Sequence, residues 1–173
     1  ILIATINSHG VASLAPTKPK GDLATRLITT LRLADGSIRT VEISEGEPGI
    51  ARVDMLSRGK TNSALVEAAV RHMLRLDQDL SGVYAKTAID PLLDWVNVGY
   101  GRMMRCQTVF EDVIKTVLTT NCAWSATIRM NERIVTELGE IDPGYVADAP
   151  FGRAFPTPAA MASRDEAFYR ETI

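Results

Sequence analysis

The stretch TVFEDVIKTVLTTNCAWSATIRMNERIVTELG, residues 108–139, decides how this chain folds. Apolar residues recur at helical spacing in its first third and predict an amphipathic helix with one buried stripe. Thr108 and Glu111 stand three residues apart at its start, as in a capping box. The polar run 119–121 disfavours helix and predicts a break. A second helix is expected to end at Gly139 in the left-handed conformation. The expected stripe of the first helix is Val109, Phe110, Val113, Ile114, Val117 and Leu118.

The first sixty residues have the pattern of β structure. Asp35-Gly36 lies between two β-rich runs, 26–33 and 37–43, and predicts a hairpin. Lys18 and Lys20 stand beside prolines and are expected to be solvated loop lysines rather than phosphate contacts. Further strands are expected at 11–15 and 50–56, and a short helix at 2–7. The sum is a small antiparallel sheet that serves as scaffold.

From Asn62 onward the period becomes helical. His72 stands alone on the first of these helices, so a structural or solvent-facing histidine is the preferred interpretation. A short helix is expected at 80–87, and Asp90-Pro91 begins another. Beyond residue 139 we expect a turn at 142–144, a helix starting at Thr157-Pro158 and a capping box of Ser163 and Glu166. The helix after Asp90 is expected to supply core residues Leu92, Leu93, Trp95 and Val96.

Composition describes a globular chain of 173 residues with 46% hydrophobic content and a net charge of −2. This balance is not that of a typical nucleic-acid binder, and no segment carries a basic run. No run approaches the length of a membrane span. Cys106 and Cys122 have neither metal-ligand spacing nor a disulfide framework, which indicates a reducing intracellular setting.

Several motifs together resemble a known family. Thr119-Thr120-Asn121-Cys122 separates the two predicted helices, after Phe110-Glu111-Asp112 and before Met130-Asn131-Glu132-Arg133. This order resembles the start of the catalytic domain in helix-hairpin-helix DNA glycosylases, above all the 8-oxoguanine and 3-methyladenine DNA glycosylase branch. The likeness extends over most of the chain, through Ser8-His9-Gly10, residues 14–17, residues 32–36 and Phe155-Pro156-Thr157-Pro158.

The resemblance implies an α+β fold. Residues 1–100 would form an antiparallel sheet domain with flanking helices, and residues 101–173 the first helices of an all-α glycosylase domain. It also implies an incomplete chain that stops before the family's phosphate-gripping hairpin and catalytic aspartate, so no catalytic residue is expected here. The implied function is base-excision repair by a DNA N-glycosylase, a hydrolase with or without AP lyase activity, with this fragment alone inactive.

In the family, the asparagine matching Asn121 fills the hole left by an extruded base and contacts the orphaned partner base. The expected DNA-binding residues are therefore Asn121, Thr120, Cys122 and Arg129. The expected partner is double-stranded DNA containing a damaged base, bound by a monomer without cofactor, metal or membrane. The setting would be bacterial cytoplasm or nucleoid, or a eukaryotic nucleus. From the residues alone, a helix C-cap is the better interpretation of Asn121, because asparagine tolerates positive φ.

The sequence departs from the 8-oxoguanine glycosylases at two places. Five residues after the turn asparagine they carry an arginine that reads the estranged cytosine, whereas this chain has Ala126, with Arg129 the nearest arginine. Their aromatic-rich lesion-contacting motif is also missing from the amino-terminal part. The damaged base therefore stays open. Two other function classes remain: a non-catalytic DNA-binding module, and an unrelated small-molecule enzyme.

Overall fold

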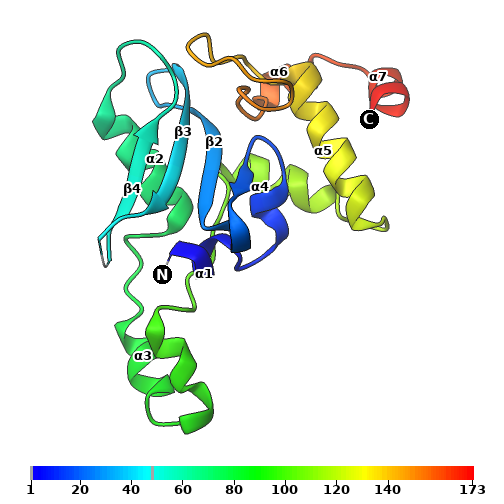
Figure 1. Cartoon of the computed structure of the whole chain (residues 1–173). Coiled ribbons are helices and arrows are strands. Elements are labelled where there is room, and N and C mark those ends of the chain that lie inside the picture. Colours follow the sequence, from blue (N-terminus) through cyan, green and yellow to red (C-terminus); the bar gives the residue numbers. More distant parts are fainter. Residues whose placement is uncertain (1, 48) are drawn as a thin grey trace.

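The computed structural model describes residues 2–47 and 49–173, so Ile1 and Pro48 lie outside the description. The fold is α+β, with a four-stranded antiparallel sheet in the order β1-β2-β3-β4 and helices beside it (Figure 1). The predicted hairpin and the predicted third strand are confirmed. The strands are β1 (Lys18–Lys20), β2 (Arg26–Arg32), β3 (Ile38–Glu45) and β4 (Ala51–Met55).

The hairpin forms where the sequence places its turn. Asp35 Oδ1 accepts a hydrogen bond from the Ser37 backbone N–H at 3.0 Å, and Gly36 adopts a positive φ of 84° that glycine takes without strain. Helix α2 (Ser63–Leu74) begins at Asn62, whose side chain caps Ala64, and covers one face of the sheet. The sheet, α2 and α1 (Leu2–Ile6) together bury a hydrophobic core. Its residues include Leu27, Leu31, Val41, Ile43, Val66, Val70, Met73 and Leu74.

The segment around Leu14 differs from prediction. Residues 11–15 were expected to form a strand, but Gly10–Ser13 is a short 3-10 helix, η1, and the chain then enters β1. Pro19 lies inside β1, and a proline without an N–H makes a short edge strand hard to recognise in the sequence. A second 3-10 helix, η2 (Asp22–Ala24), links β1 to β2.

Helix α3 (Ser81–Thr87) and the 3-10 helix η3 (Pro91–Val98) form an arm that projects away from the sheet (Figure 1). Asp90 caps η3 as predicted, accepting from Leu92 N–H at 2.9 Å. The expected core role of this segment is wrong. Leu92 is 82% exposed and Trp95 57%, Leu93 is also exposed, and Val96 is half-buried. The sequence pattern is apolar enough for a core, but α3 is the element on which η3 chiefly packs.

The two helices expected within 108–139 are α4 (Val109–Val117) and α5 (Trp124–Leu138). The prediction that α4 has a single buried apolar stripe is wrong in part. Phe110, Ile114 and Leu118 pack against a second core cluster, but a ridge of Val109, Val113 and Val117 is exposed. The fully buried positions of α4 are instead the charged residues Glu111 and Lys115.

Two predicted helix ends also need correction. Gly139 is extended, with φ of −72° and ψ of 139°, and not left-handed. Glycine is required there because a Cβ would lie 2.4 Å from Val135 O and 2.6 Å from Ala154 O. The capping box of Ser163 and Glu166 does not form, since Asp165 caps Phe168 N–H at 2.9 Å. The last helices are α6 (Pro158–Ala162), begun by Thr157 as predicted, and α7 (Glu166–Thr172).

No helix in the described part of the chain combines the length and apolar character needed to cross a bilayer.

Candidate functional site

The connection between α4 and α5 is tied together at its base. The carbonyl oxygen of Leu118 accepts a hydrogen bond from Thr127 Oγ1 at 2.9 Å and one from Cys122 Sγ at 3.1 Å. Thr127 is buried on α5, so the C-cap residue of α4 is anchored to the second turn of α5. The turn between them is therefore held in one conformation by both helices.

Within this turn, the threonine hydroxyls point back to the helix. Thr119 Oγ1 donates to Thr116 O and Thr120 Oγ1 to Val117 O, each at 2.7 Å. Asn121 is left-handed, with φ of 55°, and exposed. Among residues 2–47 and 49–173, none makes a hydrogen bond to its side chain. A rigid support thus presents a free carboxamide, with two donors and an acceptor, to the surroundings.

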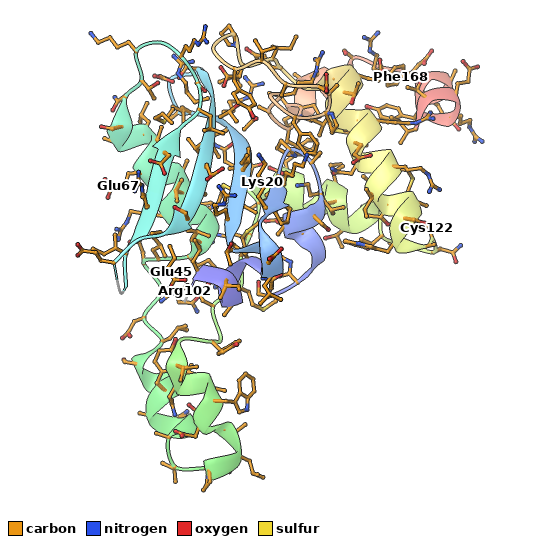
Figure 2. All side chains as sticks on the ribbon, viewed as in Figure 1. Lys20, Glu45, Glu67, Arg102, Cys122 and Phe168 are labelled. Atoms are coloured by element: carbon orange, nitrogen blue, oxygen red, sulfur yellow. The ribbon has the colours of Figure 1, made fainter. Side chains whose placement is uncertain are left out.

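The other two predicted DNA-binding residues lie near the same turn. Helices α4 and α5 form a two-helix unit, and Cys122 is exposed at the outer end of this unit, away from the sheet (Figure 2). Arg129 is exposed on α5, whose buried positions Thr127 and Asn131 lie on a different face. Within the described residues, the Arg129 guanidinium has no hydrogen bond or ion pair. The structure therefore provides an unpaired cation just over one helical turn into α5.

A buried polar cluster between α4, α5 and the amino-terminal segment was not predicted from the sequence. Lys115 Nζ lies 2.6 Å from Glu111 Oε1, with the two side chains only 1% and 6% exposed, and donates to Leu14 O at 3.3 Å. Asn131 Nδ2 donates to Ala15 O at 2.7 Å. Both helices of the unit thus bind the backbone of one amino-terminal segment. Only the i, i+4 spacing of opposite charges in FEDVIK hinted at the pair, and such pairs are usually solvated.

The same amino-terminal segment packs against the start of α5. A Cβ on Gly10 would lie 2.6 Å from Trp124 Cζ2, so glycine allows the backbone to rest on the indole ring. His9 Nδ1 accepts from Val11 N–H at 3.2 Å, which leaves Nε2 as the donor to Met104 O at 2.5 Å. The His9-Gly10 pair therefore borders the turn through Trp124, which is 45% exposed.

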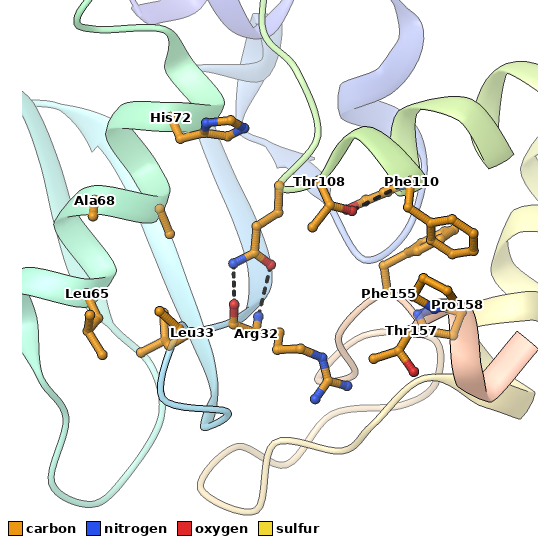
Figure 3. Close-up of a pocket in the computed structure, with 15 residues that line it drawn as sticks. Arg32, Leu33, Leu65, Ala68, His72, Thr108, Phe110, Phe155, Thr157 and Pro158 are labelled. Carbon is orange, nitrogen blue, oxygen red and sulfur yellow. Dashed lines mark hydrogen bonds between the residues drawn. The ribbon is translucent and has the colours of Figure 1, made fainter.

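A cavity of about 460 Å³ lies at the opposite end of α4 (Figure 3). Leu65, Ala68 and His72 of α2 form one wall, and Phe110 and Phe155 contribute to the other. Since α4 rises about 1.5 Å per residue, its nine residues separate this cavity from the Asn121 turn by roughly 13 Å. The two features do not form one site.

His72 has a structural environment, as the sequence indicated. Its Nδ1 lies 3.1 Å from Arg105 Nη2, and Arg105 Nε donates to the His72 carbonyl at 2.8 Å. Burial, followed by the nearby Arg105 charge, lowers the pKa of His72 below its usual 6.5. Burial likewise raises the pKa of the Cys106 thiol far above its usual range. Neither group lies in the Asn121 turn.

No protein-family model matches the sequence, and no curated protein matches it by sequence. Solved structures of DNA glycosylases are similar to this chain, including the following three. MBOgg1 in complex with a low-affinity DNA ligand matches with a TM-score of 0.58 at 19% identity, over 90% of this chain and 59% of that one. The 8-oxoguanine glycosylase/lyase of Clostridium acetobutylicum matches in complex with double-stranded DNA containing cytosine opposite 8-oxoG, with a TM-score of 0.56 at 17% identity.

The apo form of the C. acetobutylicum enzyme matches with a TM-score of 0.57 at 18% identity. Each of these two matches includes 92% of this chain. The match covers 60% of the enzyme chain in the DNA complex and 61% of it in the apo form. The chain thus spans about three fifths of the length of the structures it resembles. Identities this low establish architecture alone: this chain has an 8-oxoguanine DNA glycosylase-like fold.

Proposed function

We propose that this chain belongs to a DNA glycosylase of base-excision repair, in which Asn121 enters the duplex in place of an extruded base. The observation that carries the proposal is the free carboxamide of Asn121 on a turn anchored through Leu118 and Thr127. An enzyme that extrudes a base must fill the vacated stack with a group that wedges or hydrogen-bonds. The fold shared with glycosylases that were solved with DNA supports this assignment.

The neighbouring residues take subsidiary roles in this proposal. Arg129, exposed and unpaired within the described residues, contacts a phosphate or the orphaned base. Thr120 and Cys122 donate their hydrogens to helix carbonyls, so they stiffen the turn and retain lone pairs for DNA donors. Because Ala126 replaces the cytosine-reading arginine of the resembled enzymes, we do not assign 8-oxoguanine as the substrate.

Base removal requires more than this turn. Residues 118–123 contain no carboxylate, so nothing in the turn can act as a general base or stabilise a developing positive charge on the sugar. The proposal therefore places the excision chemistry outside this turn. The domain division near residue 100 belongs to the same proposal, with the sheet as scaffold and the α4–α5 unit as the part that contacts DNA.

Fluorescence anisotropy on matched duplexes tests the proposal. The chain should prefer a duplex containing an abasic analogue, where the stack is already open, over the intact duplex at the same salt concentration. Arg129→Ala should weaken binding to both duplexes, whereas Arg170→Ala, which removes another exposed arginine, should not. Equal affinity for both duplexes would indicate a general DNA-binding module, and no binding to either would eliminate a DNA function for this chain.

A further inference from the structure

The two edges of the sheet differ in whether their backbone groups have hydrogen-bond partners. Beyond the short β1, the backbone of Arg32 on β2 is covered by Gln107, whose side chain accepts from Arg32 N–H at 3.0 Å and donates to Arg32 O at 2.5 Å. The opposite edge is β4, and within the described residues no strand lies beside it (Figure 1). An open edge presents unpaired backbone groups that can pair with another chain.

The hydrogen bonds at both ends of the β3–β4 ladder identify the free groups. Gly46 N–H donates to Ile50 O at 2.9 Å, and Leu56 N–H donates to Thr40 O at 3.0 Å. Antiparallel partners alternate between bonded and non-bonded pairs, so even-numbered residues of β4 bond to β3. The N–H and C=O groups of Ala51, Val53 and Met55 consequently point away from the sheet.

The two faces of β4 carry different side chains. Ala51 and Val53 pack toward the α2 core, and Met55 on the same face is 40% exposed. Beside this edge, a groove of about 500 Å³ runs between β4 and α2, where Glu67 marks its outer wall (Figure 2). On the opposite face, Arg52 and Asp54 are paired at 3.0 Å and largely exposed. The edge is thus apolar toward α2 and charged on the other face.

We propose that β4 is a self-association edge, which pairs antiparallel with β4 of a second copy about a two-fold axis at Val53. This register places Val53 opposite Val53, Ala51 opposite Met55, and Arg52 opposite Asp54 of the second copy. In this register, residues 51, 53 and 55, whose backbone groups are free, lie opposite residues 55, 53 and 51 of the second copy. Each of these pairs can therefore exchange both backbone hydrogen bonds. The result is one sheet continuous through two chains.

Charge and size select this occupant over an arbitrary strand. A lone lysine on an edge strand repels a second copy, but the order Arg52-Val53-Asp54 is complementary to itself when the strand is reversed. The long Met55 side chain of each copy lies against the small Ala51 of the other, beside the groove. A two-fold interface repeats each contact, so both the attraction and any introduced repulsion count twice. The proposal replaces the monomer expected from the sequence and does not depend on the DNA-binding role.

Sedimentation velocity of the full chain over a range of concentrations tests the proposal. We expect a reversible monomer–dimer equilibrium. Arg52→Asp should raise the dissociation constant roughly tenfold or more, because two opposite-charge contacts become like-charge contacts. The double variant Arg52→Asp with Asp54→Arg restores complementarity and should restore the dimer. Arg170→Asp is the matched control, since Arg170 is likewise an exposed arginine paired with a carboxylate, Glu166, but lies on α7 and not on the sheet.

Crosslinking provides a second measurement that does not depend on charge. In a Cys122→Ser background, Val53→Cys should form a disulfide-linked dimer under mild oxidation, because the two-fold axis brings the two side chains together. Melting curves confirm that each variant is folded. A chain that stays monomeric at high micromolar concentration, or whose Val53→Cys variant crosslinks no faster than an Arg26→Cys variant, overturns the proposal. Dimerisation that the Arg52→Asp change leaves intact places the interface elsewhere and overturns it equally.

Discussion

The side-chain amide of Gln107 forms two hydrogen bonds with the backbone of Arg32, at 3.0 and 2.5 Å, and so acts as one residue of an additional strand. Gln107 immediately precedes Thr108 in the chain. Thr108 caps α4, because its side-chain oxygen accepts a hydrogen bond from Glu111 N–H at 3.1 Å. The sheet and the two-helix unit are therefore joined at the start of α4. An ion pair between Arg32 and Glu140, at 2.7 Å, makes a second connection from the same strand residue.

Replacing Gln107 tests this connection. Gln107→Ala leaves one backbone donor and one acceptor of Arg32 without their partner, and we expect a loss of about 1–3 kcal/mol in the free energy of unfolding. Urea denaturation followed by circular dichroism measures the change. Gln78→Ala is the control, because Gln78 is exposed and, among the described residues, its side chain makes no hydrogen bond. Equal stability of both variants would show that the Gln107 bonds contribute nothing.

Local sequence signals predicted elements whose structure depends on near neighbours. The Asp35-Gly36 hairpin, the helix that follows Asn62, the Thr108 cap and the polar break before α5 all lie where expected. Prediction failed where distant packing decides. Leu92 and Trp95 have core composition but find little to pack against, and Gly139 is fixed by Ala154 O, fifteen positions later in the chain.

In the candidate site, too, the sequence predicted the features set by near neighbours and missed those set by distant packing. The turn at Asn121 was predicted from its polar run, and the structure adds the positive φ that the C-cap interpretation required. The hydrogen bond from Thr127 to Leu118 O could not be foreseen, because it depends on how α5 leaves the turn. The buried Lys115 could not be foreseen either, since its environment is created by a segment about a hundred residues earlier.

The Lys115–Glu111 pair is expected to behave as a buried ion pair. Lys115→Met leaves the Glu111 carboxylate buried without its cation, which should cost about 3–5 kcal/mol of stability. Adding Glu111→Leu removes the uncompensated charge and should recover much of that loss. A double-mutant cycle by chemical denaturation measures the coupling. Additive losses in the double variant would mean that the two charges do not interact in the folded chain.

The two cysteines are expected to differ in reactivity. Cys122 is exposed, whereas Cys106 is buried and its thiol has a pKa raised by burial, with the nearby Glu111 charge as the next cause. Because the thiolate is the reactive form, a thiol reagent at neutral pH should label Cys122 promptly and Cys106 only after unfolding. Mass spectrometry of digested, labelled protein identifies the sites. Prompt labelling in a Cys122→Ser variant would contradict the burial of Cys106.

His72 gives the chain a defined dependence on pH. Burial and the Arg105 charge lower its pKa in the folded state below 6.5, so the unfolded chain binds a proton at this position more readily. Stability should therefore fall as pH drops from neutral through 6.5 toward the folded pKa of His72, and this contribution should change no further below that pKa. Urea denaturation at successive pH values measures it, and His72→Gln should flatten the curve. An NMR titration midpoint above 6.5 would contradict the expected direction.

The positive φ of Asn121 changes how its role must be tested. Alanine tolerates the left-handed conformation at φ of 55° less well than asparagine does, so an alanine substitution should cost up to about 1–2 kcal/mol whether or not the carboxamide has a function. Asn121→Ala therefore cannot separate the two roles. Asn121→Gly can, because glycine adopts this backbone conformation freely and lacks only the side chain. We expect the glycine variant to melt at nearly the same temperature as the wild type.

If the carboxamide fills the vacated stack, Asn121→Gly should weaken binding to the duplex with an abasic analogue while binding to single-stranded DNA is unchanged, since an unpaired strand has no stack to fill. Arg129→Ala provides the contrast, because loss of a phosphate contact should weaken binding to both and reduce the dependence on salt. Anisotropy titrations at two salt concentrations distinguish these patterns. A glycine variant that binds every DNA like the wild type, while Asn121→Ala is destabilised, would leave Asn121 with a purely conformational role.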